Sequence, residues 1–196
     1  MNGAILAGGS ASRLGGAPKG LLEVGGQRIL DRLVASFERA LGTLPLLVAN
    51  APAAASWRAD LRVTADLRPG AGSLGGLLTA VLAAPAPVVC VAWDMPFVPA
   101  ALIAALAAGL AGGDVCIPES GGRRGVEPLC AGYGPATGPA MAAALDRGDL
   151  RAIAFHDAVR VTRLPESVVR QFGEPERLFF NVNTADDLVR ANGMAL

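Results

Sequence analysis

Lysine is almost missing from this chain of 196 residues. Lys19 stands alone beside sixteen arginines, and the formal net charge is zero. The longest basic cluster is the pair Arg123 and Arg124, which is too small for the positive surface that binds nucleic acids or anionic lipids. We therefore expect a small molecule as the partner, and neither a nucleic acid nor a membrane.

No targeting segment is visible either. The apolar run nearest the N-terminus covers only residues 4–7, and no basic residue precedes it. Such a run is too short for a signal peptide or a membrane span, so we expect a cytoplasmic protein. No linker rich in proline, glycine or serine divides the chain into two apolar parts. A chain of this length can bury one full core, and we expect one domain over residues 1–196.

Cysteine and histidine are scarce. Cys90, Cys116 and Cys130 lie far apart in apolar runs and form no Cys-x-x-Cys pair, so we interpret them as buried core thiols. His156 is the only histidine, and the absence of a second one argues against a zinc site or a catalytic role. The chain offers no Ser/His/Asp set for nucleophilic catalysis.

Short β-rich runs alternate with helical patterns, which indicates right-handed β-α-β crossovers. The fully apolar run 88–92 is typical of a central strand covered on both faces. The sequence predicts an α/β fold, a single-domain, Rossmann-like three-layer sandwich with a mainly parallel sheet. The predicted strands are 3–6, 44–49, 61–64, 87–93 and 114–118, and the predicted helices lie near 28–41, 74–84, 99–111, 135–146 and 184–192.

A further strand is predicted over residues 127–133, where Pro128 favours the edge of the sheet or the start of a strand. The alternation becomes less regular in the last third of the chain. We therefore divide the domain into a nucleotide-binding half, about 1–118, and an acceptor-binding half, about 119–196.

The first predicted strand leads into residues 8–16, which contain four glycines and two serines. Glycines let backbone N–H groups approach an anion in conformations that a Cβ would forbid. Lys19 follows, and its compact ammonium on a thin stem fits between the oxygens of a polyphosphate. The spacing matches neither the dinucleotide-binding glycine motif nor a P-loop, because Pro18 and Gly20 flank Lys19. We expect a phosphate site of another kind.

Residues 6–21 read Leu-Ala-Gly-Gly-x-x-x-Arg-Leu-Gly-Gly-x-x-Lys-Gly-Leu. This segment resembles the signature of the molybdenum cofactor guanylyltransferases, within the wider nucleotidyltransferase superfamily. Three later segments are similar to further family motifs in the same order, and the resemblance spans positions 4 to 188. These segments are Asp-Leu-Arg-Pro-Gly-Ala-Gly-Ser-Leu-Gly-Gly at 66–76, Trp-Asp-Met-Pro-Phe-Val-Pro at 93–99 and Phe-Asn-Val-Asn-Thr at 180–184.

The resemblance implies a reaction in which a phosphate of molybdopterin, or of the molybdenum cofactor, attacks the α-phosphorus of GTP with the help of Mg²⁺. The products are the guanine dinucleotide cofactor and pyrophosphate, and cofactor-receiving enzymes are possible transient partners. Such transfer depends on positioning and on neutralising negative charge, so it needs cations, aimed N–H groups and a metal-holding carboxylate. The chain offers these parts.

The resemblance also implies roles for individual residues. It assigns catalysis to Arg13, Lys19 and Asp94, with Asp94 holding the metal. It places Asn181 and Asn183 at the acceptor, and Glu127 near the acceptor pocket. The implied nucleotide-binding residues are Leu6, Ala7, Gly8, Gly9, Ser10, Lys19, Asn50, Asp66 and Asp94.

Spacing gives independent support for three of these residues. Asn50, Asp66 and Asp94 each follow a predicted strand end, and ligands bind beyond the carboxyl ends of strands in such sheets. Local structure offers an alternative for each, because all three residues also suit turns or helix caps. The same alternative of turn hydrogen bonding holds for Asn181 and Asn183, while Thr184 suits the N-cap of the last predicted helix.

Three positions depart from the family pattern. Pro18 stands where an aspartate is usual, Ser73 where a proline is usual, and Trp93 where a cysteine is usual. Pro18 removes a carboxylate but fixes φ near −65°, so the loop geometry can persist. Trp57 and Trp93 could stack on a base, although we expect Trp93 to pack against the sheet.

Other activities stay open. A CTP-dependent molybdenum cofactor cytidylyltransferase and a sugar-phosphate nucleotidyltransferase would share many of these motifs. Leu-Ala-Gly-Gly argues against the former, whose relatives resemble Leu-Ala-Ala-Gly at this point. A non-catalytic GTP-binding module in cofactor synthesis is the alternative from another class, and the loss of the acid at Pro18 is its support.

Overall fold

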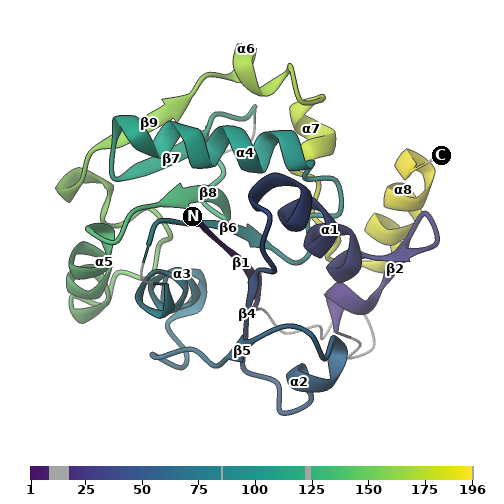
Figure 1. Cartoon of the computed structure of the whole chain (residues 1–196), viewed down its shortest axis with the longest axis horizontal. Coiled ribbons are helices and arrows are strands. Elements are labelled where there is room, and N and C mark those ends of the chain that lie inside the picture. The colour runs from purple at the N-terminus through teal and green to yellow at the C-terminus, as the bar shows by residue number, and fades with distance from the viewer. Residues whose placement is uncertain (9–17, 85, 122–124, 196) are drawn as a thin grey trace.

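The computed structural model describes residues 1–8, 18–84, 86–121 and 125–195. A seven-stranded sheet in the order β5-β4-β1-β6-β8-β7-β9 runs through this part of the chain (Figure 1). The strands are β1 (Asn2–Ala7), β4 (Leu46–Ala49), β5 (Val63–Thr64), β6 (Val88–Ala92), β7 (Val115–Pro118), β8 (Cys130–Tyr133) and β9 (Val161–Leu164), and β2 (Glu23–Val24) and β3 (Gln27–Arg28) form a separate hairpin.

Most neighbouring strands are parallel. The strands β5, β4, β1 and β6 run parallel to one another, as do β7 and β9, while β8 runs antiparallel to β6 and β7. In the centre, Ile5 lies between Leu47 and Val91. All five residues of β6 are buried, as the apolar run 88–92 predicted. The prediction of a mainly parallel sheet is confirmed.

Helices cover both faces of the sheet (Figure 1). The helices α1 and α4 pack on one face with Ile5 and Val91, while α3 and α5 pack on the other with Ala4 and Leu6. This arrangement confirms the three-layer α/β sandwich. The helices are α1 (Ile29–Leu41), α2 (Ala54–Trp57), α3 (Gly72–Ala83), α4 (Ala100–Gly109), α5 (Thr137–Asp146), α6 (Glu166–Val169), α7 (Pro175–Leu178) and α8 (Ala185–Ala195), with 3₁₀ turns η2 (Lys19–Leu21), η3 (Leu110–Gly112) and η4 (His156–Ala158).

The strand predicted over 127–133 has an unexpected position. The structure forms β8 inside the sheet, between β6 and β7, so the expectation of an edge position was wrong and that of a strand start was correct. Pro128 precedes the strand, and its missing N–H therefore costs no hydrogen bond in the ladder. The Pro128 carbonyl accepts a hydrogen bond from the Tyr133 hydroxyl at 2.5 Å.

The three cysteines are free and buried, as predicted. Burial raises the pKa of the Cys116 thiol to about 11, and burial also raises the pKa values of Cys90 and Cys130 far above the usual range. These thiols stay protonated at neutral pH and serve as core packing. None of the helices in the described part of the chain has the length and apolar composition needed to cross a membrane.

Candidate active site

A pocket of about 470 Å³ opens at the carboxyl edge of the parallel strands. Ala7 and Gly8 line it at the end of β1, Asn50 follows β4, and Asp94 follows β6. The strands therefore bring side chains from distant parts of the sequence to one rim, as expected for an open α/β sheet. The remaining lining residues are Leu6, Lys19, Val48, Asp66, Gly70, Gly72, Ser73, Gly76, Ala92 and Leu129.

Three polar side chains meet at one end of the pocket. The Lys19 ammonium donates hydrogen bonds to Asp94 Oδ2 at 3.2 Å and to Asn183 Oδ1 at 2.5 Å. The Lys19 and Asp94 side chains are only 10% and 15% exposed. Burial raises the pKa of the Asp94 carboxyl, and the charge and hydrogen bond of Lys19 oppose that rise. A buried carboxylate of this kind needs a cation beside it to stay ionised.

The same cluster suits a divalent cation. Two hard oxygen ligands, a carboxylate from Asp94 and an amide oxygen from Asn183, already converge on one positive group. Mg²⁺ is usually held by one or two carboxylates together with substrate phosphate oxygens and water. Among the described residues no group of three or more His, Cys, Asp or Glu side chains forms a complete protein cage for a metal. The residues therefore fit a Mg²⁺ ion that has one or two protein oxygens as ligands and takes its other ligands from nucleotide phosphates and water.

The backbone holds Lys19 in a short, stiff turn. Pro18 has φ −60°, within the range that its ring imposes. The N–H of Leu21 donates to the Pro18 carbonyl at 3.0 Å, and the N–H of Leu22 donates to the Lys19 carbonyl at 3.1 Å. The φ value of Pro18 is therefore the expected one, while the phosphate loop whose geometry it was expected to preserve lies outside the described residues.

Trp93 packs directly against this turn. A Cβ at Gly20 would lie 2.5 Å from Trp93 Cε3, so only glycine fits under the indole. Trp93 is 3% exposed and stacks on Trp57, with ring centroids 5.1 Å apart and an interplanar angle of 27°. Neither ring lines the pocket. Trp93 therefore packs at its strand end, as expected, and joins the turn of Lys19 to the segment of Asp94.

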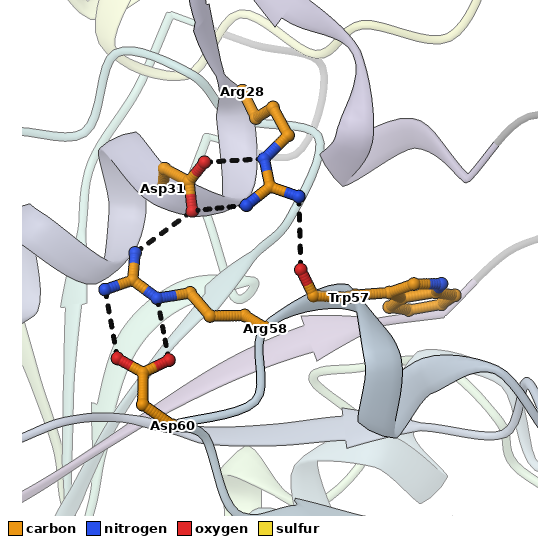
Figure 2. Close-up of polar contacts among 5 residues, drawn as sticks. All are labelled: Arg28, Asp31, Trp57, Arg58 and Asp60. Atoms are coloured by element: carbon orange, nitrogen blue, oxygen red, sulfur yellow. Dashed lines mark hydrogen bonds and ion pairs between the residues drawn. The ribbon is translucent and has the colours of Figure 1, made fainter.

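A network of charged side chains holds the backbone of Trp57 in place (Figure 2). Arg28 donates to both carboxylate oxygens of Asp31, at 2.6 and 3.0 Å, and to the Trp57 carbonyl at 3.1 Å. Arg58 donates to Asp31 at 3.0 Å and forms two hydrogen bonds with Asp60, at 2.9 and 3.1 Å. The network ties the end of α2 to the first turn of α1.

Asn50 and Asp66 hold each other at another part of the rim. Asn50 Nδ2 donates to Asp66 Oδ2 at 2.7 Å, and the Asp66 backbone N–H donates to Asn50 Oδ1 at 2.7 Å. Asp66 Oδ1 accepts no hydrogen bond from the described residues and lies 3.7 Å from where a Cβ of Gly76 would be. The two residues are 16 positions apart in the sequence, so their hydrogen bonds do not belong to a local turn.

The two asparagines near the C-terminus have different positions. Asn183 reaches Lys19, as described above, whereas Asn181 Nδ2 donates to the Phe179 carbonyl at 2.8 Å. Asn181 also lines a hollow of about 330 Å³ with Ser120 and Glu127, whose side chains share a hydrogen bond of 2.8 Å. Only Asn183 therefore reaches the Lys19 and Asp94 cluster, and Asn181 shows the turn hydrogen bond that was its local alternative.

Thr184 is a helix cap, as predicted. Its Oγ1 accepts a hydrogen bond from the Asp187 N–H at 3.1 Å, and Asp187 Oδ2 accepts one from the Thr184 N–H at 3.0 Å. The same carboxylate oxygen accepts from the Asn183 N–H at 3.1 Å. This reciprocal cap fixes the backbone that presents Asn183 to Lys19.

Some expected residues have no described position, and some lining residues were not expected. Gly9, Ser10 and Arg13 lie outside the described residues. Gly70 and Gly72 line the pocket with φ +80° and +60°, values that favour glycine, and the motif at 66–76 already contained them. No signal in the sequence pointed to Leu129, which enters from the acceptor half just before β8.

Comparisons with known proteins agree with this geometry. The family model described as "MobA-like NTP transferase domain" matches residues 3–161. A probable molybdenum cofactor guanylyltransferase of Pelotomaculum thermopropionicum is 34% identical, covering 98% of this chain and 92% of that protein. The molybdenum cofactor guanylyltransferase of Mesorhizobium japonicum is also 34% identical, covering 96% and 93%.

A solved structure is similar over nearly the whole chain. It is the molybdopterin-guanine dinucleotide biosynthesis protein A from Archaeoglobus fulgidus, with a TM-score of 0.81, 28% identity and coverage of 99% of this chain and 98% of the other. Its similarity includes both the parallel strands of the first half and the β7, β8 and β9 region. The chain belongs to the MobA-like NTP transferases and, among them, to the molybdenum cofactor guanylyltransferase family.

Proposed function

We propose that the protein transfers GMP from GTP to the terminal phosphate of molybdopterin or of the molybdenum cofactor. An oxygen of the acceptor phosphate bonds to the α-phosphorus of GTP, the bond from that phosphorus to the bridging oxygen breaks, and pyrophosphate leaves. Membership of the family supports this reaction. The observation that carries it is the meeting of Lys19, Asp94 and Asn183 at the end of a nucleotide-sized pocket.

Lys19 would neutralise charge on the nucleotide phosphates. Its ammonium is buried at the edge of the pocket, where a positive charge acts through less water than it would on the surface. It moves no proton in this scheme, because the transfer depends on positioning and charge neutralisation. Arg13 would add a second charge, a role that comes from the resemblance alone.

Asp94 would hold Mg²⁺, with Asn183 as a candidate second oxygen ligand. When bound, this ion would neutralise phosphate charge and make the α-phosphorus easier to attack. The raised pKa of Asp94 fits such a role, because a buried carboxylate gains more from a nearby cation than an exposed one does. Lys19 supplies part of that positive charge before any nucleotide arrives.

Asn50 and Asp66 would bind the nucleoside. Asp66 Oδ1, which has no donor among the described residues, can accept hydrogen bonds, and guanine presents two neighbouring donors, N1–H and the N2 amino group. Leu6, Ala7 and Gly8 would form the wall beside it, with Gly9 and Ser10 contributing by resemblance. The small residues Gly70, Gly72 and Gly76 leave room for the nucleotide at the start of α3.

The acceptor would bind on the side of the second half. Asn183 links the catalytic cluster to that half, and the hollow at Asn181 and Glu127 lies there too. Transient contact with cofactor-receiving enzymes and a cytoplasmic location stay predictions.

The test is turnover by the purified protein. Labelled GTP and CTP are supplied in parallel with Mg²⁺ and molybdopterin or the molybdenum cofactor, and the dinucleotide and pyrophosphate are measured. Product from GTP alone supports the proposal. Product from CTP would reassign the protein to the cytidylyltransferase activity, and GTP binding without product would favour the non-catalytic module.

A further inference from the structure

A second hollow, of about 430 Å³, lies on the side of the sheet covered by α1 and shares no lining residue with the nucleotide pocket. We propose that this arginine hollow, lined by Arg32, Ser36, Arg39 and Arg177, binds a small oxyanion, either an organic phosphate or a polycarboxylate. This proposal does not rest on the proposed function, because it concerns other residues and another ligand.

One face of α1 supplies most of the polar groups. Arg32, Ser36 and Arg39 are spaced by four and three residues, which places them along a single side of the helix. Arg177 joins them from α7, which lies close to the end of α4 in Figure 1. Two elements separated by more than a hundred residues thus present cations to one concave surface.

The positive charges of this hollow lack carboxylate partners. The side chains of Arg39 and Arg177 form no ion pair or hydrogen bond with any described residue, and the Arg177 guanidinium contacts only the Phe97 ring. Glu174 is the single acid among the described lining residues, and its carboxylate is bound to Arg170, which is not part of the lining. The hollow therefore carries uncompensated positive charge.

Two of the cations share one aromatic ring. The guanidinium carbons of Arg32 and Arg177 lie 5.9 and 5.1 Å from the centroid of Phe97. Burial lowers the pKa of Arg32, and the neighbouring charge of Arg177 lowers it further, so the two guanidinium groups repel each other. An oxyanion between them would replace this repulsion with two charge-assisted hydrogen bonds.

Hydrogen-bond donors in the hollow are held in place but only partly used. Arg32 Nε donates to the Pro96 carbonyl at 3.1 Å and Nη1 donates to the Val24 carbonyl at 3.3 Å, while Nη2 has no partner among the described residues. Ser36 is only 6% exposed, and within the described chain its hydroxyl also has no partner. A buried hydroxyl and a fixed guanidinium edge facing a cavity are suited to an anionic ligand.

The walls indicate that the ligand also has an apolar part. Phe97, Phe172 and Leu178 line the hollow beside the arginines. Pro96 and Phe97 belong to the segment that follows Asp94, so a bound ligand would rest against the chain that carries the catalytic carboxylate. The concave shape of the hollow and its mixture of charged and apolar lining residues suit a small organic anion better than a protein partner, which would bind a flatter surface.

Calorimetry with the full chain tests the proposal. Inorganic pyrophosphate and citrate serve as probes, and Lys19→Ala removes the main cation of the nucleotide pocket. We expect at least one probe to bind to Lys19→Ala, and to bind roughly tenfold to a hundredfold more weakly when Arg39→Gln and Arg177→Gln are added. Binding of pyrophosphate or of citrate identifies a phosphate or a carboxylate ligand.

Matched variants keep the test decisive. Arg147→Gln removes an exposed arginine next to α5, on the opposite face of the sheet, and should leave binding unchanged. Arg177→Gln alone provides the measurement should the combined variant fail to fold. The proposal is wrong if neither probe binds to Lys19→Ala, or if the probes bind equally well with and without Arg39 and Arg177.

Discussion

The nucleotide pocket has two differently built ends. At one end, Lys19 and Asp94 are nearly buried, and the Trp57 and Trp93 stack packs against the turn that carries the lysine. At the other end, Asn50 is exposed and Asp66 is half-buried, and two hydrogen bonds join them to each other. The comparison teaches that the end proposed for chemistry is fixed by packing, while the end proposed for nucleoside recognition is fixed by local polar contacts.

Removing the carboxylate of the buried end should have the largest effect. We expect Asp94→Ala to lower Mg²⁺-dependent GMP transfer by on the order of a hundredfold or more, because the proposed metal ligand is lost. Circular dichroism should show an intact fold. A chelator should abolish turnover of the native protein in the same assay, and full activity of Asp94→Ala would remove this residue from the metal site.

Removing the cation of the buried end should come next. We expect Lys19→Ala to lower kcat/KM for GTP by roughly tenfold to a hundredfold, which corresponds to the loss of one charge-assisted partner of about 1.5–3 kcal/mol. Steady-state kinetics with varied GTP give the value. Arg62→Ala, which removes an exposed cation outside the pocket, is the control, and equal activity of Lys19→Ala and this control would contradict the assignment.

Disturbing the packing of the buried end tests whether packing positions the chemistry. In Gly20→Ala the new Cβ would lie 2.5 Å from Trp93, so overpacking should cost about 1–3 kcal/mol of stability and should lower kcat more than it raises KM. Thermal unfolding and kinetics measure both effects. Gly193→Ala in α8 adds a Cβ in open space and is the control. Unchanged kcat in a folded Gly20→Ala variant would show that the turn tolerates displacement.

The end formed by Asn50 and Asp66 should show the smallest effect, and mainly on binding. We expect Asp66→Asn to raise KM for GTP by about tenfold while kcat changes little, because a half-buried, hydrogen-bonded carboxylate contributes about 1–1.5 kcal/mol. Asp146→Asn, an exposed carboxylate paired with Arg68 outside the pocket, is the matched control. A large loss of kcat in Asp66→Asn would place this residue at the reacting phosphates instead.

The sequence predicted the parallel part of the fold well, because short apolar strands and glycine-rich turns have strong local signals. The run 88–92 and the pattern around α1 fall within a few residues of the observed elements. Local signals were weaker for β9, whose residues are half-buried or exposed and which the sequence did not predict. The inner position of β8 depends on pairing with distant strands, which no local pattern encodes.

The candidate site divides in a similar way. Asn50, Asp66 and Asp94 could be placed on one rim because each follows a strand, and the structure brings all three to the pocket. The bond between Lys19 and Asn183 could not be inferred from spacing, since the two residues are 164 positions apart. The mutual stacking of Trp57 and Trp93 was equally hidden, because it depends on where α2 packs.

The hydrogen bond between Lys19 and Asn183 also has a consequence for co-translational folding. Most of the sheet, including β1, β4, β5 and β6, is synthesised before residue 93. The hydrogen bond from Lys19 to Asn183 can nevertheless form only after Asn183 has been synthesised. The same holds for the hydrogen bond from the Gly25 N–H, in the β2–β3 hairpin, to the side chain of Asn192. Contacts of such long sequence separation form late. A nascent chain can therefore form most of the sheet while the proposed catalytic cluster of Lys19, Asp94 and Asn183 is still incomplete, and this cluster closes only when the residues next to the last helix have been synthesised.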